Sequence, residues 1–548
     1  MAPSLTPDFS RQREILSVIS RSGWEYMTDA LQSKDGKADE GPRLPLPRVL
    51  RDILIELGPT FIKLGQLLST RPDLLPPEYI DELSALQADV PAVPWELIEQ
   101  TIRSELTAPL ETVFRQFNPV PVAAGSLAQI YRAELASGEA VAVKVQRPAI
   151  EPIVESDIGI LKALADWFSE RTRWGKYYDA KALAEEFAGS LRAELDFRLE
   201  GKYTDTLRAN LKNSPWFNVD RVSVPLVYWQ YTTRRVLVLE WIEGVPILTR
   251  PLPQNSPELA ELAVKAFFQQ IYIDGFFHAD PHPGNLFRWQ DSSGRLNVAL
   301  LDCGMTGTLD PRTQQILTEQ LLAIVEEDPQ RFTQLALELG QVVDTVNFSR
   351  LQGEFDRLLR LYYNRSLTQI NFGALLNDML RVLRTNGVRL PGNIGLYVKA
   401  LANLEGVART LDPDFNLIET LKPLITDLFR RRLFGAAPLQ EALRSALDLR
   451  TLALSFPRRF DLLLQRLTSE TFQFNVQVAG VESLRTGLIT ASNRIALSVM
   501  VGGLILGAAV VIAADPTGRM LWFSGTLFAF ASLLGISLIV SILRSKAL

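Results

Sequence analysis

Alternating hydrophobic and polar positions in the first third of the chain predict β-structure. In the stretch FNPVPVAAGSLAQIYRAELASGEAVAVKVQRP, residues 117–148, β-rich runs flank the turn residues Ser137 and Gly138, which is typical of a β-hairpin. The second run alternates three valines with other residues: Val141, Val143 and Val145. Successive side chains of a strand point to opposite faces, so Lys144 faces away from the valines. Such an ammonium group either faces solvent or holds a phosphate.

Helical spacing dominates both sides of this hairpin. Residues 1–110 predict an N-terminal helical extension, and a helical insertion follows the hairpin before strands around VSVPLVYWQY and RRVLVLEW. From Pro251 onward the pattern is helical again, interrupted by the short strand LNVALLDCG. We therefore expect an α+β, two-lobed fold, with a strand-rich lobe at 111–245 and a helical lobe at 246–440.

Two hydrophobic runs lie near the C-terminal end of the sequence. Residues 495–514 and 521–543 contain 20 and 23 residues without a charge, and each run is long enough to cross a bilayer. The short polar connection DPTGR separates them. We expect a transmembrane helical hairpin over residues 495–548, and two buried core helices are the alternative.

Basic residues around the hairpin predict its orientation. Arg485 and Arg494 precede the first run, and Arg544 and Lys546 follow the second. Because basic flanks stay in the cytoplasm, we expect a two-span membrane protein with its large N-terminal body on the cytoplasmic side. A GxxxG pair in the first run would admit the second run or another protomer.

A helical, membrane-proximal segment is expected at 441–494, between the helical lobe and the hairpin. This region and the end of the lobe before it carry arginines near apolar stripes: Arg430, Arg431, Arg432, Arg458 and Arg459. These side chains either snorkel toward anionic headgroups or form a solvated face.

Composition narrows the functional classes. A chain of 548 residues with 47% hydrophobic content is too large for a single core, so we expect two or three folded units. The net charge of −5 and the scattered Lys and Arg residues argue against nucleic acid as a partner. The single cysteine, Cys303, excludes an internal disulfide framework. The charged N-terminus lacks the continuous apolar stretch of a secretory signal.

Both histidines of the chain fall within FFHADPHPGN, residues 276–285. Protein kinases carry a catalytic loop of the form H-x-D-x-x-x-x-N, an Asp-x-Gly at a strand end, and a strand lysine paired with a helix glutamate. These groups orient the acceptor, hold Mg²⁺ and anchor the phosphates of ATP. The chain has each of them in order: Lys144, Glu200, Asp280, Asn285 and Asp302. We therefore predict phosphoryl-transfer chemistry, with Lys144, Glu200 and Asp280 as catalytic residues and Asn285 and Asp302 as metal ligands.

The two histidines have different expected roles. His278 takes the position that fixes the catalytic loop of kinase-like folds through backbone hydrogen bonds. His282 either shapes the turn between Pro281 and Pro283 or contacts phosphate or metal. Neither needs to act as a general base, because Asp280 is better placed for that task.

With these motifs, the sequence resembles the UbiB protein-kinase-like family, which is associated with coenzyme Q and related prenylquinone metabolism. LGPTFIKLGQLLSTRPDLLPPEY resembles its K-x-G-Q signature and ELDF its E-x-D motif. PVAAGSLAQIYRA is similar to its alanine-rich nucleotide loop and HADPHPGN to its catalytic loop. The resemblance covers roughly residues 50–405 together with the membrane hairpin.

The resemblance implies that the K-x-G-Q helix covers the nucleotide cleft as a lid. Lys63 would then face the acids of the E-x-D motif, Glu194 or Asp196, and Gln66 shares its face of the helix. An amphipathic surface helix is the alternative. No Ala-Pro-Glu segment follows Asp302, so the usual platform for a peptide substrate is missing and phosphorylation of other proteins is disfavoured.

The nucleotide loop departs from the family pattern of three alanines followed by glycine. The expected nucleotide-binding residues are Ala123, Ala124, Gly125, Ser126, Lys144, Glu240 and Ile242. Gly125 makes the backbone more flexible, which would let it approach phosphate closely. Ala128, in contrast, restricts backbone conformations that are open to relatives at this position. Gly201 and Tyr203 follow Glu200, where the family favours Ala and Asn, and Cys303 replaces Phe in the metal-binding turn.

The resemblance implies a membrane-anchored kinase or ATPase that uses ATP and Mg²⁺ on a prenylquinone precursor or another lipid. A homodimer through the transmembrane or K-x-G-Q helices is a further expectation. The alternative function is a pseudokinase-like scaffold or lipid carrier for quinone-biosynthesis enzymes. An aminoglycoside-type phosphotransferase would share the H-x-D-x-x-x-x-N loop, but it would lack the K-x-G-Q element and any reason for a membrane hairpin.

Overall fold

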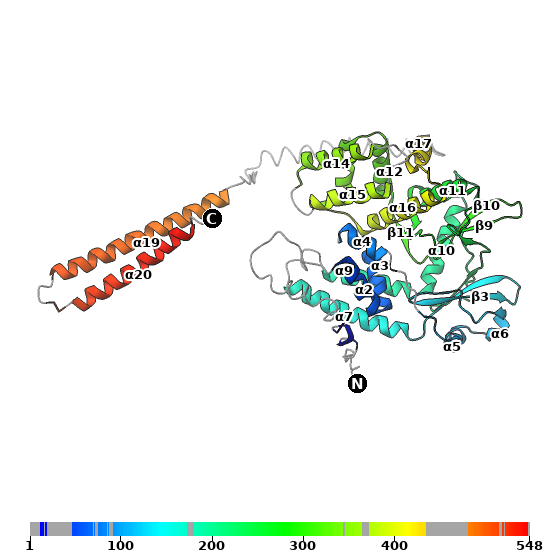
Figure 1. The fold of residues 1–548 in the computed structure, drawn as a ribbon, viewed down its shortest axis with the longest axis horizontal. Coiled ribbons are helices and arrows are strands. Elements are labelled where there is room, and N and C mark those ends of the chain that lie inside the picture. Colours follow the sequence, from blue (N-terminus) through cyan, green and yellow to red (C-terminus); the bar gives the residue numbers. More distant parts are fainter. Residues whose placement is uncertain are drawn as a thin grey trace, which may run out of the picture. The chain divides into compact units, whose positions relative to one another are not determined.

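The computed structural model describes residues 11, 13–15, 17–18, 46–69, 71, 75–84, 86, 91–171, 180–342, 346–363, 372–434, 481–514, 518–519 and 521–545. The chain divides into two units, Met1–Ala436 and Ala437–Leu548, called unit 1 and unit 2 below. Unit 1 holds the sequence motifs for phosphoryl transfer, and unit 2 holds the two hydrophobic runs (Figure 1).

A five-stranded antiparallel sheet forms the first lobe of unit 1. Its strands run in the order β1-β3-β4-β6, with β2 paired to β3: β1 (Phe114–Phe117), β2 (Ala123–Ala124), β3 (Ala128–Leu135), β4 (Ala140–Gln146) and β6 (Val236–Glu240). The predicted hairpin is confirmed, since β3 and β4 pair in antiparallel register across a turn in which Gly138 has a φ of 98°.

The two faces of β4 differ as the alternation predicted. The three valines of β4 are fully buried and pack with residues of α5 (Trp95–Glu105) and α6 (Leu110–Val113). Lys144 lies on the opposite face, and the exposed fraction of its side chain is only 16%. The interpretation of Lys144 as a solvent-facing strand residue is therefore wrong.

Helices between β4 and β6 border this sheet: α7 (Ile150–Arg171), α9 (Ala180–Glu194) and α10 (Phe197–Leu211). Helix α10 begins after Asp196, whose side chain accepts a hydrogen bond from the Arg198 backbone N–H and so caps the helix. The cap places Glu200 in the first turn of α10, where it is buried.

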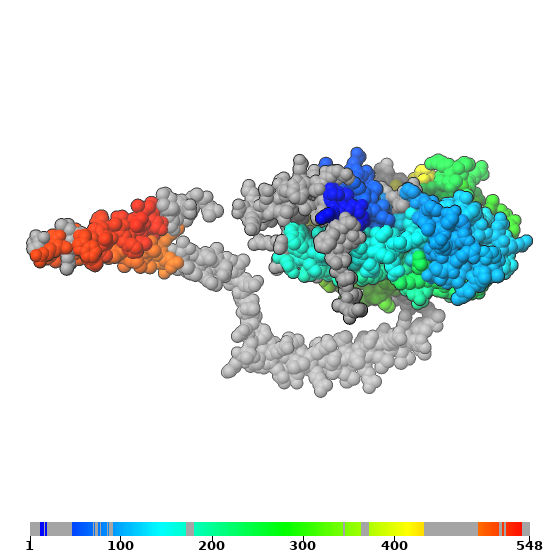
Figure 2. Space-filling model, turned by 90° about the horizontal axis from the view of Figure 1, so that it is seen from below, coloured from blue at the N-terminus to red at the C-terminus, as the bar shows by residue number. Residues whose placement is uncertain are grey.

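Three short helices precede the sheet and each begins at a proline: α2 (Pro47–Leu57), α3 (Pro59–Leu68) and α4 (Pro77–Ser84). They pack closely at Gly65 of α3, where a Cβ atom would lie 2.3 Å from Leu86 Cδ1 and 2.9 Å from Leu54 Cδ1. Their buried side chains form one cluster with Leu161 of α7. Figure 2 shows the blue N-terminal helices and the cyan helices next to each other on the surface of unit 1.

The second lobe contains short strands and many helices. One sheet has the order β5-β10-β9-β7, with β5 (Val222–Ser223), β7 (Val245–Pro246), β9 (Leu286–Gln290) and β10 (Leu296–Leu300); β8 (Phe276–His278) pairs with β11 (Thr306–Thr308), and β12 (Gln341–Val342) with β13 (Val388–Arg389). Its helices are η1 (Val219–Arg221), α11 (Ser256–Gln269), η2 (Gln270–Asp274), α12 (Pro311–Val325), α13 (Pro329–Leu339), α14 (Phe348–Tyr363), α15 (Phe372–Thr385), α16 (Gly392–Leu411) and α17 (Leu417–Phe434). Residues of α11 to α17 share the largest buried cluster. The predicted two-lobed α+β fold is confirmed.

Strand pairing in the second lobe brings the two candidate metal-binding turns together. Leu286 at the start of β9 pairs with Leu300 at the end of β10, and the Leu301 backbone N–H donates to the Asn285 carbonyl at 2.8 Å. On the other side, Thr306 of β11 pairs with His278 of β8. The segments on both sides of Asp302 are therefore fixed against the catalytic loop.

Unit 2 is a pair of long helices, α19 (Val481–Ala514) and α20 (Leu521–Ser545), that run side by side (Figure 1). Ala491–Ala514 and Trp522–Ile539 are long and apolar enough to cross a membrane, with mean hydropathies of 2.6 and 1.7. Only 6% and 11% of these windows are buried, so the alternative of two buried core helices is not supported. The Ser524 hydroxyl donates to the Ala508 carbonyl at 2.9 Å and ties the helices together.

The GxxxG pair does not form this helix contact. No described atom outside the local helix lies within 4 Å of a Cβ atom built at Gly503 or Gly507. The expectation that these glycines admit the second run is therefore wrong, and an approach by another protomer stays a prediction. Instead, Gly535 of α20 faces Val501 of α19.

Part of the predicted membrane-proximal segment lies outside the described residues. Residues 435–480, which include Arg458 and Arg459, are not described, and neither is the side chain of Arg432. Arg430 and Arg431 both pair with Asp427 on the exposed side of α17, which fits the solvated face better than snorkelling.

Candidate active site

Lys144 of β4 lies at the centre of a charged cluster. Its Nζ atom donates to both carboxylate oxygens of Glu200, at 2.8 and 2.9 Å, and lies 3.4 Å from Asp302 Oδ1. Burial raises the pKa of Glu200, and the Lys144 ammonium opposes that rise. The three residues come from β4, α10 and the turn after β10, so the structure brings together groups that lie up to 158 positions apart.

Asp302 is held in an unusual backbone conformation. Its φ is 51°, in the left-handed region that few residues other than glycine adopt. The Gly304 backbone N–H donates to Asp302 Oδ1 at 3.3 Å, which orients the carboxylate. The nearby Lys144 charge holds the pKa of Asp302 well below its usual range, so this group is ionised and able to bind a cation.

His278 fixes the catalytic loop, as predicted. Its ring accepts a hydrogen bond from the Asp280 backbone N–H at Nδ1 (3.1 Å), and its Nε2 lies 3.0 Å from the Leu301 carbonyl. These partners define the neutral tautomer, with the proton on Nε2. Burial lowers the pKa of His278 below its ordinary value, which also favours the neutral ring. The histidine therefore ties the catalytic loop to the residue before Asp302.

His282 lies in the turn between Asp280 and Asn285 and makes a hydrogen bond within it. Its Nδ1 accepts from the Gly284 backbone N–H at 3.0 Å, and its Nε2 lies 4.0 Å from Asp280 Oδ2. Of the two interpretations of His282, the hydrogen bond to Gly284 supports the one in which His282 shapes the turn. Asn285 closes the loop, because its Nδ2 donates to the Asp280 carbonyl at 3.1 Å.

Two polar side chains that the sequence motifs did not identify also reach Asp280. Lys399 Nζ lies 3.4 Å from Asp280 Oδ1, and Asn403 Nδ2 donates to the same oxygen at 3.4 Å. Both residues are on α16, more than a hundred positions from the loop. Their spacing of four is visible in the sequence and puts them on one helix face. No sequence feature, however, indicates that this face meets Asp280.

The K-x-G-Q helix contacts the E-x-D motif through its lysine. Lys63 Nζ of α3 lies 2.8 Å from Glu194 Oε2 at the end of α9. Gln66 does not face the acids, because its Nε2 donates to the Leu86 carbonyl at 2.8 Å and anchors α3 to its neighbour. Asp196 pairs instead with Arg198 at 2.6 Å, so of the two acids expected to face Lys63 it is Glu194 that does.

The expected nucleotide-binding residues Ala123 and Ala124 form β2, where Ala123 is exposed and Ala124 half-buried, and the nucleotide loop then connects β2 to β3. The backbone of Gly125 is engaged, since its N–H donates to the Ala128 carbonyl and its carbonyl accepts from Arg147 Nε, both at 2.8 Å. Ser126 is buried beneath the loop. Gly125 thus shapes the loop rather than offering a free N–H to phosphate.

Two of the expected nucleotide-binding residues, Glu240 and Ile242, lie at the end of β6 and just after it. The Glu240 backbone N–H donates to the Leu226 carbonyl at 2.8 Å, and its side chain accepts from the Leu226 N–H at 3.1 Å. Ile242 comes two residues later and is partly exposed in the link between the lobes. The structure therefore places both residues at the edge of the first-lobe sheet.

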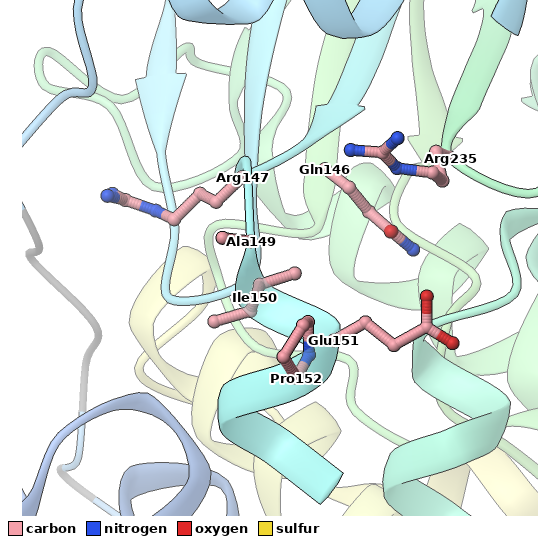
Figure 3. Close-up of a pocket in the computed structure, with 7 residues that line it drawn as sticks. All are labelled: Gln146, Arg147, Ala149, Ile150, Glu151, Pro152 and Arg235. Atoms are coloured by element: carbon pink, nitrogen blue, oxygen red, sulfur yellow. The ribbon is translucent and has the colours of Figure 1, made fainter. Parts of the chain in front are cut away.

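A small pocket lies behind the nucleotide loop, where β4 leads into α7 (Figure 3). It is lined by Gln146, Arg147, Ala149, Ile150, Glu151, Pro152 and Arg235. Its volume of about 210 Å³ is below the roughly 300–1,000 Å³ of typical ligand sites. It also lacks Lys144 and Asp302, so it is not the candidate active site.

The residues present fit a magnesium ion that is shared with phosphates. In the described part of the chain, no group of three or more His, Cys, Asp or Glu side chains could hold a metal by itself. Mg²⁺ is usually bound by one or two carboxylates together with substrate phosphates and water. Asp302 offers an ionised carboxylate, and Asn285 uses its Nδ2 internally, which leaves Oδ1 as the atom for a cation.

Comparisons with known proteins agree with this arrangement. Residues 85–336 match the ABC1 atypical kinase-like domain, 355–416 the UbiB helical domain, and 479–544 the ABC1/UbiB kinase-like C-terminal domain. The third match spans nearly all of α19 and α20.

Curated relatives match most of the chain. An uncharacterized protein of Synechocystis sp. is 50% identical over 72% of this chain and 97% of its own length. The probable protein kinase UbiB of Marinobacter nauticus is 34% identical over 74% of each chain. Protein ACTIVITY OF BC1 COMPLEX KINASE 7, chloroplastic, of Arabidopsis thaliana is 33% identical over 90% of this chain and 70% of its own. With its three domain matches and these relatives, the chain belongs to the ABC1/UbiB family of atypical kinase-like proteins.

Proposed function

We propose that this chain is a membrane-anchored atypical kinase or ATPase that uses Mg-ATP to support prenylquinone or related lipid metabolism. The observation that carries the proposal is the contact of Lys144 with both Glu200 and Asp302. Under this proposal Lys144 anchors the phosphates and Asp302 binds the metal beside it, a pairing that phosphoryl transfer requires. A scaffold without turnover would need neither group.

In the proposed reaction, Asp280 orients the acceptor and receives its proton. The acceptor oxygen bonds to the γ-phosphorus, the bond from that phosphorus to the bridging oxygen breaks, and ADP leaves. With water as acceptor the products are ADP and inorganic phosphate. Lys144 holds the phosphates, while Asn285 and Asp302 would hold Mg²⁺, which supplies positive charge against the developing negative charge.

The acceptor is water or a small molecule rather than a protein. Only three residues separate Asp302 from β11, and α12 begins at Pro311, so little chain is left for a peptide platform. The α3 helix is also held at the cleft by the Lys63–Glu194 pair. Both features favour a covered site.

The exposed apolar surface of unit 2 supports a lipid setting. The apolar side chains of unit 2 are largely exposed, as those of Val499, Leu506 and Trp522 show at 70%, 68% and 72%. Such a surface is stable in contact with lipid. The link to prenylquinones rests on the resemblance to UbiB proteins and on the relative of that name.

The test is Mg-dependent ATP turnover by the full-length chain in liposomes, with and without a prenylated phenolic precursor of a quinone. We expect turnover that requires Mg²⁺, rises with the precursor and falls about 100-fold or more in Asp280→Asn. A wild-type chain that binds Mg-ATP but never exceeds the Asp280→Asn rate would instead favour the scaffold.

A further inference from the structure

Helix α16 lies against the catalytic loop although it is outside the part of the chain that matches the kinase-like domain. That match ends at residue 336, and α16 falls within the match to the helical domain at 355–416. From α16, Lys399 and Asn403 both reach Asp280 Oδ1, each at 3.4 Å. Two polar groups of a separate domain thus converge on one oxygen of the proposed catalytic carboxylate.

The catalytic loop has no strong cation of its own. Between Asp280 and Asn285 the sequence is Pro-His-Pro-Gly, without lysine or arginine. His282 uses Nδ1 for the turn, and its Nε2 is 4.0 Å from Asp280. Among the described residues, Lys399 is the lysine or arginine with an ion pair to Asp280.

The position of Lys399 is fixed by the rest of α16. Tyr397 shares a buried 2.6 Å hydroxyl–hydroxyl hydrogen bond with Tyr272, just before the catalytic loop. Asn393 donates from Nδ2 to the Thr308 carbonyl of β11 at 3.1 Å. The Lys399 side chain is only 15% exposed, so it is not a freely moving surface lysine. Its ammonium group is therefore held in place before any substrate arrives.

The contacts of Lys399 and Asn403 also distinguish the two carboxylate oxygens of Asp280. Lys399 and Asn403 both engage Oδ1, whereas His282 Nε2 lies 4.0 Å from Oδ2, beyond hydrogen-bond distance, so we assign Oδ2 to an acceptor hydroxyl or water. A carboxylate with one oxygen fixed by a cation has a defined direction for its second oxygen.

We propose that Lys399 completes the catalytic loop as a positioning residue that aims Asp280 and provides the positive charge the loop lacks. This inference rests on the proposed function, because it assigns Lys399 to the same phosphoryl-transfer site. Under this inference the helical domain contributes a residue to the active site. The kinase-like part of the chain, residues 85–336, is incomplete without it.

The experiment compares Mg-ATP turnover and calorimetric Mg-ATP binding for the full-length wild type, Lys399→Met and Lys399→Arg in liposomes. Lys265→Met is the matched control, since within the described part of the chain Lys265 forms its ion pair with Glu261 on its own helix. We expect Lys399→Met to lower kcat by about 10- to 100-fold while the KM and Kd for Mg-ATP change less than about threefold. Lys399→Arg should recover most of the rate, and Lys265→Met should behave as wild type.

The outcomes separate this inference from the proposed function. A Lys399→Met chain that keeps the wild-type kcat overturns the inference alone, as does an arginine variant that is as slow as the methionine variant. A loss of Mg-ATP binding in step with the loss of rate also overturns it, because a positioning residue acts on kcat. A wild-type chain without turnover contradicts the proposed function and removes this inference with it.

Discussion

Lys63 Nζ lies 2.8 Å from Glu194 Oε2, and this ion pair joins the N-terminal helix α3 to the end of α9. Burial on its own would lower the pKa of Lys63, but the Glu194 carboxylate outweighs it and raises the pKa above the ordinary value. Lys63 is therefore a charged group that is already paired within the protein. Lys144 supplies the ammonium for the phosphates, so Lys63 is better suited to hold a lid.

We predict that Lys63→Ala opens the cleft without abolishing nucleotide binding. The variant should keep its Kd for Mg-ATP within about threefold, because Lys144 remains in place, and should gain autophosphorylation on N-terminal serines and threonines. Lys144→Ala should lose Mg-ATP binding. Calorimetric titration and phosphosite mass spectrometry of the full-length chain measure both effects.

Lys162→Ala is a matched control for the lid variant, since Lys162 also bridges two helices of this region through a 2.7 Å pair with Glu185. It should leave both readouts unchanged, whereas Glu194→Gln should reproduce Lys63→Ala. The two lid substitutions should be non-additive because they break the same contact. Loss of Mg-ATP binding in Lys63→Ala equal to that in Lys144→Ala, with the fold intact, would make Lys63 an anchor and refute the lid.

Asp196 should affect stability instead of gating. It caps α10 and pairs with Arg198, so we expect Asp196→Ala to lower the free energy of unfolding by about 1 kcal/mol. Asp196→Asn should retain most of that stability, because asparagine caps a helix equally well. Thermal unfolding in detergent measures the first effect, and the autophosphorylation assay checks gating. New phosphosites in Asp196→Asn, matching those of Glu194→Gln, would show that both acids hold the lid.

A larger side chain at Gly65 should destabilise the N-terminal helices. A Cβ atom at this position would lie 2.3 Å from Leu86 Cδ1, so in Gly65→Ala the buried Leu86 and Leu54 side chains must shift, which should cost about 1–3 kcal/mol. Gly159 is the control, because it lies exposed in α7 with no neighbouring atom within 4 Å among the described residues. There alanine should stabilise the helix by about 0.5–1 kcal/mol. Equal unfolding temperatures for the two variants would contradict the packing argument.

Much of the fold and the site could be predicted because the decisive signals are local. The valines around Lys144 alternate with a period of two, and the structure buries them while Lys144 lies on the opposite face and pairs with Glu200. The spacing of His278, Asp280 and Asn285 likewise predicts that the three residues share one loop. Charge-free runs of 20 and 23 residues indicated the two long helices in the same way.

The remaining features depend on contacts between distant segments. Nothing in the sequence near Lys399 shows that α16 meets Asp280, since the contact depends on how the helical lobe packs. The two acids of the E-x-D motif looked equivalent in the sequence. In the structure they differ, because Arg198 pairs with Asp196 and Lys63 pairs with Glu194. The prediction that the GxxxG pair contacts the second helix was wrong because small residues permit a close helix contact without specifying one.

Unit 2 should insert as a hairpin with both ends on one side of the membrane. Its two apolar helices are joined by a short connection, and Arg485 and Arg494 lie outside that connection on the N-terminal side. Protease treatment of sealed vesicles should therefore digest the N-terminal body and a C-terminal tag from the same side. Digestion of the two from opposite sides, or of both helices without detergent, would refute the hairpin.

The central claim is that Mg-ATP binds between Lys144 and Asp302, with Asp302 holding the metal. Its most direct test is calorimetric titration of the full-length wild type and Asp302→Asn with ATP in the presence and absence of Mg²⁺. Asp310→Asn is the control, because Asp310 caps α12 nearby and asparagine preserves a cap. We predict that Asp302→Asn weakens Mg-ATP binding more than about tenfold, or about 1.4 kcal/mol, and that Asp310→Asn does not. Unchanged Mg-ATP affinity in a folded Asp302→Asn chain would contradict the account.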